Sequence, residues 1–391
     1  MPGPPGSTSA MQALIADANE GERFLEFVQI KRPADIFPCL SVTVHHGADA
    51  LMKRRSRWAR EIRSDILAGK AVSYDRFTRL FRFTPSYLAC DLHPDYYSTR
   101  YACFLEEQYG IPLVRVQHHH AHIASCMAEH GLDEPVTGIC FDGTGFGTDG
   151  QIWGGEFLLA DGREFKRYTH FDYVPMPGGD RAVAEPWRMA LSYLYKYFGD
   201  TLDYRDIGPF SSIVESEFIL VKEMIRNNVN SPLTSGAGRL FDAVSALTGI
   251  CPGSAFDSEA PMRLESAINC NTNDFYPYSV NGPVSFRKTF EALLEDIISR
   301  KTSVSLISAK FHNTVARIIL DVSEEMRDKY SVDKVVLSGG VFQNKYLLEK
   351  TVSSLQKAKL RIYTNSQVPS NDGGISLGQM AVASKFFGLC V

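Results

Sequence analysis

Four of the chain's ten histidines lie within five positions, in the stretch QHHHAH at residues 117–122. Side chains at positions i and i+4 of a helix share one face, so His118 and His122 can direct two imidazoles at one point, while His119 and His120 point elsewhere. Two imidazoles are two ligands of a metal ion, and a catalytic metal also needs a third ligand and an open position. Spacing alone leaves two hypotheses open: a metal site, or a helix N-terminus with exposed rings.

A third ligand must come from elsewhere in the chain. The best candidate is Asp372, in the turn PSNDGGIS that opens the last predicted helix, where a carboxylate also benefits from the helix N-terminus. The alternative for Asp372 is a helix cap and nothing more.

Two glycine-rich turns follow predicted strands. The first, DGTGFGTDG at residues 142–150, has glycines that let backbone N–H groups approach an anion. The second, LSGGVFQN at residues 337–344, places a Gly-Gly pair before a helix N-terminus, where a phosphate or a base can lie against backbone. The alternatives are a wide hairpin turn for the first and tight strand–helix packing for the second.

Hydrophobic patterning predicts alternating strands and helices. The expected elements are strand 111–117, helix 118–132, a strand from 136 that leads into the loop 142–150, hairpin 151–171, helices 185–198, 213–227, 238–250 and 308–330, strand 334–340, helix 341–358, strand 360–366 and helix 371–388. This order predicts an α/β sheet with helices on both faces and ligands at the carboxyl ends of its strands.

Composition bounds the function classes. The 391 residues are 44% hydrophobic and 22% charged, which suits a globular protein of two domains or two lobes. The net charge of −4 gives no general attraction to nucleic acid or membrane, and the basic run at residues 53–63 is interpreted as a solvated helix face. The eight scattered cysteines form no zinc knuckle or disulfide framework and predict buried thiols in a reducing compartment. Without a secretory leader or an 18-residue apolar run, we expect a cytoplasmic protein.

Several runs together resemble the C-terminal, TsaD-like domain of the HypF carbamoyltransferases of [NiFe]-hydrogenase maturation. They extend in unbroken order over about residues 84–391: DLHPDYYSTRYA (91–102), VQHHHAHIASCMAEHGL (116–132), FDGTGFGTDGQIWGGEFLLAD (141–161), PMPGGDRAVAEPWRMA (175–190), GAGRLFDAVSALTGI (236–250), LSGGVFQN (337–344) and SNDGGISLGQ (370–379).

The resemblance implies a two-lobed actin/Hsp70-like ATPase (ASKHA) fold with nucleotide between the lobes. It implies that His118, His122 and Asp372 bind a divalent metal, zinc or iron, and it assigns no catalytic residue beyond them. The residues it implies for ATP, AMP or carbamoyl-adenylate are Asp142, Gly143, Thr144, Gly145, Gly238, Asp242 as acceptor from ribose hydroxyls, Gly339 and Gly340, with Glu265 and Asn344 as weaker candidates.

The implied chemistry is transfer of a carbamoyl group from carbamoyl-adenylate to the C-terminal cysteine of the partner HypE, on the way to the cyanide ligand of the hydrogenase. The attacking thiolate belongs to the partner, which fits the absence of a Cys-His or Ser-His-Asp pattern here. Other readings are an O-carbamoyltransferase of small molecules, a TsaD-like tRNA-modifying protein, and a binding module that keeps the fold without turnover.

The predicted domain organisation is a disordered tail at 1–10, a divergent region of unknown role at 11–83, and the TsaD-like domain at 84–391, with lobes at about 84–200 and 201–391. The zinc-finger, acylphosphatase and YrdC-like adenylating parts of HypF, and the opening phosphate strand of this domain, are not found in residues 1–83. We therefore expect an incomplete first lobe, and a YrdC-like domain acting in trans or in a longer parent chain.

Overall fold

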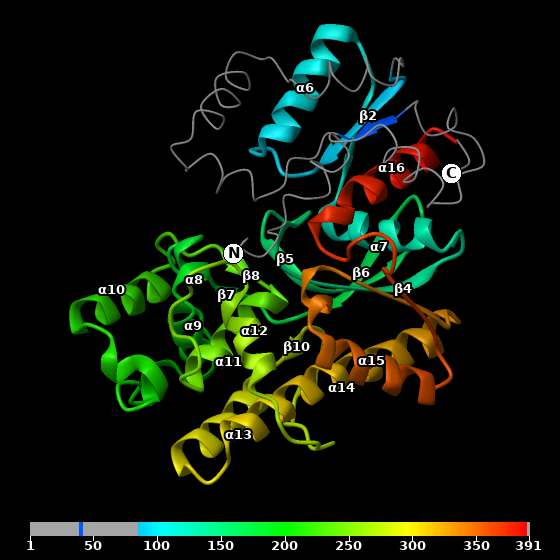
Figure 1. The fold of residues 1–391 in the computed structure, drawn as a ribbon. Coiled ribbons are helices and arrows are strands. Elements are labelled where there is room, and N and C mark those ends of the chain that lie inside the picture. The colour runs from blue at the N-terminus through cyan, green and yellow to red at the C-terminus, as the bar shows by residue number, and fades with distance from the viewer. Residues whose placement is uncertain (1–38, 42–84, 389–391) are drawn as a thin grey trace, which may run out of the picture. The chain divides into compact units, whose positions relative to one another are not determined.

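Two compact units make up the part of the chain that the computed structural model describes, residues 39–41 and 85–388 (Figure 1). Within those ranges, unit 1 comprises residues up to 135, 160–165 and from 363 onward, and unit 2 comprises 136–159 and 166–362. The division does not coincide with the lobe boundary predicted near residue 200, because residues 136–159 and 166–200 belong to unit 2 and the C-terminal segment, which packs with the histidine helix, belongs to unit 1. The predicted tail, the region 11–83 apart from residues 39–41, and the basic run 53–63 lie outside the described residues.

Unit 1 is built on a three-stranded parallel sheet in the order β1 (Cys39–Ser41), β2 (Tyr87–Asp91), β3 (Leu113–Val116). Its helices are α6 (Tyr97–Tyr109), α7 (His118–Glu129) and α16 (Ile375–Phe386). The predicted strand 111–117 and helix 118–132 are therefore confirmed, with α7 ending two residues before Gly131, whose φ is +61°. Strands β2 and β3 are parallel, and only one residue separates β3 from α7. The carboxyl ends of both strands therefore lie next to the start of α7.

Helices α7 and α16 pack closely through small residues. Ala121 and Ala124 of α7 form one apolar cluster with Ile375, Ala381 and Val382. Where they cross, a Cβ added to Gly378 would lie 1.7 Å from the carbonyl oxygen of Ala121. The backbones touch because this position is glycine, and the contact holds the segment around Asp372 against the histidine helix.

Unit 2 contains most of a larger sheet, with the strand order β12-β11-β4-β5-β8-β7 and β6 paired to β5. The strands are β4 (Val136–Phe146), β5 (Ile152–Ala160), β6 (Phe165–His170), β7 (Val174–Pro175), β8 (Leu233–Thr234), β11 (Lys334–Ser338) and β12 (Arg361–Thr364). Strand β11 runs parallel to β4, with Val335 opposite Thr137 and Ser338 opposite Cys140. The predicted hairpin at 151–171 is present as β5 and β6.

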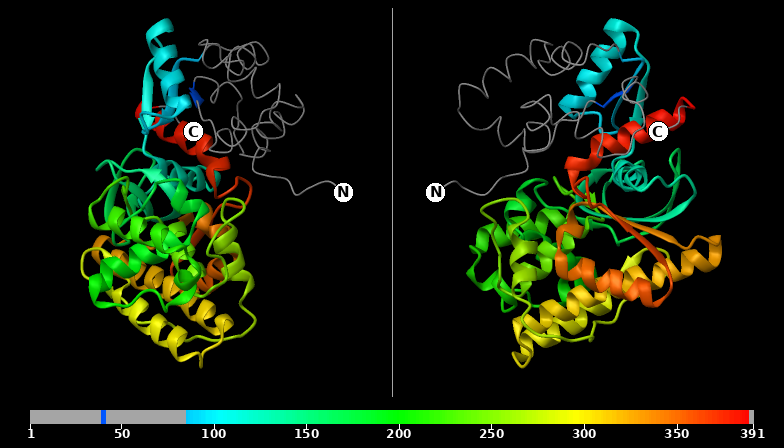
Figure 2. Two further views of the ribbon diagram at one scale, coloured as in Figure 1. Left: turned by 90° about the vertical axis from the view of Figure 1, so that its left-hand side faces the viewer. Right: turned by 45° about the vertical axis from the view of Figure 1, so that its right-hand side comes forward.

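The predicted helices are all found. Unit 2 contains α8 (Arg181–Ala184), α9 (Trp187–Phe198), α10 (Glu215–Arg226), α11 (Ala237–Leu247), α12 (Glu259–Ser266), α13 (Arg287–Ser299), α14 (Val304–Tyr330) and α15 (Lys345–Lys357), with a small hairpin of β9 (Ser279–Val280) and β10 (Val284–Ser285). Both views in Figure 2 show the yellow helices α13 and α14 along one edge of this unit. The apolar faces of α9, α11 and α14 enclose a large aromatic core with the inner residues of β4 and β5.

Two predicted boundaries were wrong. The stretch 142–150 was expected to be a loop, but β4 continues through Phe146, and the turn is confined to 147–151, where Gly147 N–H donates to the Gln151 carbonyl at 2.8 Å. Helix 341–358 was expected to begin at Val341. A 3-10 turn (Gly340–Gln343) comes first, and α15 begins at Lys345 because the Asn344 side chain caps it by accepting from Leu347 N–H at 2.8 Å.

The prediction that most cysteines are buried thiols is confirmed for the described residues. Six cysteines there carry free thiols, and four of the six are buried: Cys90, Cys126, Cys140 and Cys251. Within the same residues, no helix combines the length and the apolar character that crossing a membrane requires.

Candidate functional site

Helix α7 begins with all four clustered histidines buried. His118, His119, His120 and His122 are each at most 2% exposed. The helix starts here because Gln117 caps it, its side-chain oxygen accepting from His120 N–H at 2.9 Å. The hypothesis of a helix end with exposed rings is therefore wrong.

His118 and His122 share a face of α7 and meet Asp372, as the spacing predicts. Asp372 Oδ1 lies 3.6 Å from His118 Nε2 and 3.4 Å from His122 Nε2. The cap of the turn Asp372–Gly374 is its neighbour Asn371, whose side chain accepts from Gly373 N–H. The Asp372 carboxylate is thus not the helix cap of the alternative hypothesis, and it points to the two imidazoles.

A second carboxylate fixes the orientation of His118. Asp91, at the end of β2, lies with Oδ2 2.9 Å from His118 Nδ1 and is 4% exposed. Burial opposes ionisation, but the hydrogen bond and charge of His118 and the backbone N–H of His93 hold the pKa of Asp91 below its usual value. A carboxylate on Nδ1 keeps the proton there and leaves Nε2 as the metal-binding nitrogen. Asp91 was missed as a site residue at the sequence level, although it opens the run DLHPDYYSTRYA that carries part of the family resemblance.

The two other histidines have structural partners. His119 Nδ1 lies 3.0 Å from the Gln117 amide nitrogen. His120 Nε2 lies 2.7 Å from the Asp161 carbonyl oxygen, and burial lowers the pKa of His120, so a neutral ring donates to this carbonyl. The ring also contacts Phe165. Only two of the four histidines are therefore oriented toward Asp372.

The residues present fit a divalent metal ion. One possible ligand atom of each of His118, His122 and Asp372 lies within 4.8 Å of the others. Two imidazole nitrogens and one carboxylate oxygen suit zinc and iron alike, and such a set leaves coordination positions for a ligand.

Replacing Asp91 with asparagine is expected to weaken metal binding about 10- to 100-fold while the three proposed ligands stay in place, because His118 Nδ1 loses its charged acceptor and an amide fixes the tautomer less strongly. Metal titration of the wild-type and Asp91→Asn proteins followed by calorimetry measures this. Exposed Asp95, which pairs with Arg100, provides the control Asp95→Asn, for which no change is expected. Equal affinities for all three proteins would remove Asp91 from the site.

In unit 2 the predicted nucleotide-binding segments meet at glycine backbones. A Cβ added to Gly238 would lie 3.0 Å from Gly143 Cα, and one added to Gly236 would lie 2.4 Å from the Gly143 carbonyl oxygen. A Cβ at Gly339, whose φ is +100°, would lie 2.3 Å from the Phe141 carbonyl oxygen. The structure therefore brings β4, the start of α11 and the turn after β11 together. Of the other predicted residues, Thr144 and Gly145 lie on β4 and Gly340 begins the 3-10 turn.

Asp242 is buried on α11 beside an arginine. Arg239 Nε lies 2.9 Å from Asp242 Oδ2, although the two groups are not aligned for a hydrogen bond. Burial raises the pKa of Asp242 to about 6, and the Arg239 charge opposes the rise. Arg239 Nη2 also lies 3.5 Å from where a Cβ on Gly143 would be. Sequence reasoning missed Arg239 as a candidate anion-binding group, although it sits three residues before Asp242 in the first turns of the helix.

The two weaker candidates are engaged within the protein. Asn344 caps α15, and its amide nitrogen lies 2.9 Å from His312 Nε2. His312 Nδ1 lies 2.8 Å from the Ser308 carbonyl oxygen, and burial lowers the pKa of His312 to about 4, so the ring is neutral and accepts from Asn344. Glu265 Oε1 accepts from Tyr346 N–H at 3.1 Å. These contacts fix the start of α15, and direct contact of either residue with nucleotide stays a prediction.

The raised pKa of Asp242 predicts a pH-dependent stability. The folded state binds this proton more tightly than the unfolded state, so ionisation of Asp242 destabilises the fold progressively as the pH rises from about 4 to about 6. The shift corresponds to about 3 kcal/mol. We therefore compare the free energy of unfolding of Asp242→Asn with that of wild type. The difference, variant minus wild type, is expected to be larger at pH 7.5 than at pH 4 by about this amount. Urea unfolding at both pH values measures it, and a pH-independent difference would contradict the burial argument.

Comparison with known proteins identifies the family. The second subdomain of the carbamoyltransferase Kae1-like domain matches residues 138–379, and the HypF Kae1-like domain matches residues 66–129. The chain belongs to the HypF carbamoyltransferase family. The family match begins upstream of residue 84, where we had predicted the domain to begin.

HypF relatives align over most of this chain. Carbamoyltransferase HypF2 of Cupriavidus necator is 38% identical over 78% of this chain and 40% of its own length. Carbamoyltransferase HypF of Synechocystis sp. is 34% identical over 78% and 40%, and a carbamoyltransferase HypF homolog of C. necator is 34% identical over 76% and 77%. The chain thus spans about two fifths of the first two relatives.

Solved HypF structures confirm the fold. Full-length HypF, crystallised in a phosphate- and nucleotide-bound form, matches with a TM-score of 0.75 at 39% identity over 81% of this chain and 41% of that one. HypF of T. kodakarensis matches with a TM-score of 0.71 at 30% identity over 81% and 44%. The predicted membership in the HypF family and the TsaD-like (Kae1-like) fold are both confirmed.

Proposed function

We propose that this chain carries out the transfer half of the HypF reaction, moving a carbamoyl group from carbamoyl-adenylate to the C-terminal cysteine thiolate of a HypE-like acceptor. The observation that carries the proposal is the convergence of the predicted residues into two groups: His118, His122 and Asp372 in unit 1, and the glycine backbones of unit 2, beside which Arg239 also lies. Support also comes from the nucleotide-bound HypF structure, which is similar to 81% of this chain.

In the proposed reaction, unit 2 binds the adenylate. Gly238 and Gly339 let the start of α11 and the turn after β11 pack directly against the backbone of β4. First-turn N–H groups of α11 favour an anion. Arg239 adds positive charge beside Gly143 as AMP departs. Asp242 is proposed to accept from the ribose hydroxyls and to hold Arg239 in place.

In unit 1, His118, His122 and Asp372 would hold the divalent ion, and Asp91 would keep His118 Nδ1 protonated. Such an ion, when bound, supplies a Lewis acid for a phosphate or carbamoyl oxygen. The acceptor thiolate forms the new C–S bond at the carbamoyl carbon, and the bond from that carbon to the adenylate oxygen breaks, releasing AMP. A YrdC-like domain, in trans or in a longer parent chain, would supply the adenylate.

The test is to mix the metal-loaded chain with carbamoyl-adenylate and HypE and to measure the intact mass of HypE. We expect a carbamoyl mass increase that disappears when the C-terminal cysteine of HypE is replaced by alanine. An unchanged HypE mass, with metal and nucleotide demonstrably bound, would favour a binding module without turnover and contradict the proposal.

A further inference from the structure

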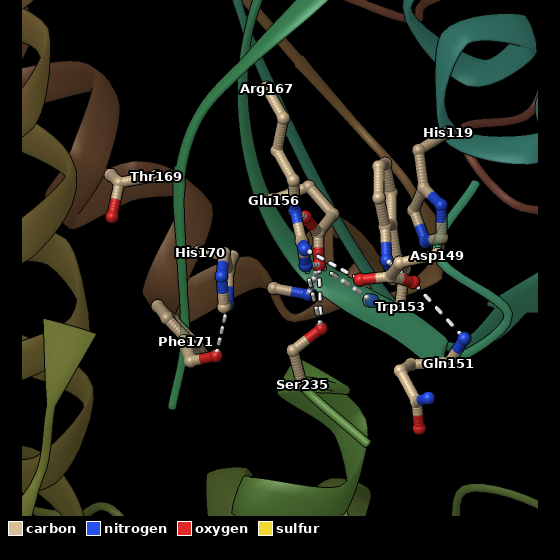
Figure 3. Close-up of polar contacts among 12 residues, drawn as sticks. His119, Asp149, Gln151, Trp153, Glu156, Arg167, Thr169, His170, Phe171 and Ser235 are labelled. Carbon is tan, nitrogen blue, oxygen red and sulfur yellow. Dashed lines mark hydrogen bonds and ion pairs between the residues drawn. The ribbon is translucent and has the colours of Figure 1, made fainter. Parts of the chain in front are cut away.

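A buried carboxylate in unit 2 gathers donors from three segments of the chain. Glu156 on β5 is fully buried, and its two oxygens accept from Arg167 of β6, Nε at 2.6 Å and Nη2 at 3.1 Å (Figure 3). The hydroxyl of Ser235, directly before the loop into α11, donates to Glu156 Oε1 at 2.6 Å. A buried carboxylate is tolerated because these donors compensate for the water it has lost.

Arg167 is held on every side by the protein. Its guanidinium lies 3.8 Å from the centre of the Trp153 ring, and Nη1 lies 2.9 Å from the Tyr173 hydroxyl and 3.3 Å from Asp149 Oδ2. Asp149, in the turn between β4 and β5, also accepts from Trp153 Nε1 at 2.8 Å (Figure 3). The N–H groups of Arg167 thus point to protein acceptors, so the pair suits a positioning role rather than direct contact with a ligand.

The same carboxylate binds glycine backbone that adjoins the proposed nucleotide site. Glu156 Oε1 accepts from Gly154 N–H at 3.2 Å and from Gly155 N–H at 3.3 Å. A Cβ at Gly154 would lie 2.7 Å from the Asp142 carbonyl oxygen and 2.9 Å from Gly236 Cα. One oxygen atom therefore ties β5 to the residue before Gly236, at the place where β4, β5 and the start of α11 touch.

From this geometry we propose that Glu156, Arg167 and Ser235 form a positioning cluster that sets the distance between β4 at Gly143 and the N-terminus of α11. Backbone donors bind an anion strongly only when they are already in place, since ordering them during binding costs conformational entropy. The cluster thereby determines the affinity of unit 2 for the phosphate of an adenylate. This role rests on the proposed nucleotide site and deepens it.

The test is Ser235→Ala, which removes one donor and leaves the Glu156–Arg167 ion pair intact. We expect the dissociation constant for AMP, measured by calorimetry on the full chain, to rise about tenfold, comparable to the loss of one hydrogen bond to a charged group. The KM for carbamoyl-adenylate is expected to rise by a similar factor with kcat nearly unchanged. Ser323→Ala is the matched control, because this serine is equally buried and its hydroxyl donates to the Ile319 carbonyl within α14 at 2.7 Å.

The control separates positioning from simple destabilisation. Both variants lose one buried hydroxyl, so similar urea midpoints with weaker AMP binding only in Ser235→Ala would support the cluster. Arg167→Lys, which keeps the charge but cannot bind Glu156 with two nitrogens in the same geometry, is expected to weaken AMP binding as well. If Ser235→Ala and Arg167→Lys both bind AMP as tightly as wild type, the positioning role is wrong.

Failure of the proposed reaction gives a different result. If wild type binds AMP but transfers no carbamoyl group to HypE, the transfer reaction is contradicted while the AMP affinities of the variants still decide the role of the cluster. If wild type binds no AMP, the nucleotide site and the cluster's role are both contradicted.

Discussion

Replacing either His118 or His122 with alanine is expected to lower metal affinity more than 100-fold, so that the dialysed protein retains little metal. Each substitution removes one of the three proposed ligands, and the loss of a supporting residue outside the ligand shell already costs about 10- to 100-fold. The distances from both Nε2 atoms to Asp372 Oδ1, 3.6 and 3.4 Å, make the two ligands nearly equivalent. Metal content per chain, measured by plasma mass spectrometry after dialysis, is the readout.

The control is the histidine that faces the other way. His120 donates to the Asp161 carbonyl, so His120→Ala is expected to lose stability while it retains metal. Urea unfolding alongside the metal measurement separates the two effects. Equal loss of metal from all three variants would show that α7 binds metal in a different arrangement or responds only as a folded unit.

Among the described glycines of unit 1, Gly378 is the one whose replacement by alanine is expected to lower stability most. On an exposed helix, alanine in place of glycine would stabilise by about 1 kcal/mol. Here the added Cβ would lie 1.7 Å from the Ala121 carbonyl oxygen, so the two helix backbones must separate, and we expect a net loss of about 3 kcal/mol. Because Asp372 lies just before α16 and Ala121 lies between the paired histidines, metal affinity should fall as well.

Urea unfolding and metal titration of Gly378→Ala test this prediction together. Gly253→Ala is the control, since a Cβ there would have no atom within 4 Å, and it is expected to change neither property. A Gly378→Ala protein as stable as wild type would mean that α7 and α16 adjust without cost, and the close contact would then have no part in holding Asp372.

Local patterns in the sequence identify the elements well and their ends less well. The spacing of His118 and His122 predicts a shared helix face, and both rings do meet Asp372. The extent of β4 was missed because glycines at 143 and 145 are typical of loops, whereas here both lie in the strand and the backbones of Gly236 and Gly238 pack close to Gly143. That closeness depends on long-range packing, which a local pattern does not contain.

The supporting residues of the site were missed for a similar reason. Asp91 precedes His118 by a strand and a helix, and nothing in its local sequence indicates which ring it meets. The sequence predicts only a hairpin around Glu156 and Arg167, yet in the structure the two side chains form an ion pair with a buried carboxylate. Arg239 and Asp242 are close in sequence, but only the structure reveals that they form a buried charged pair.

The order of the two units along the chain determines which of them is completed first during translation. Unit 1 takes its last part from residues 363 onward, whereas unit 2 is already complete at residue 362. During synthesis the histidines of α7 therefore leave the ribosome long before Asp372 and α16 exist. Since domains tend to fold as they emerge, unit 2 can fold while the proposed set of metal ligands is still incomplete, and that set is complete only once Asp372 has been translated.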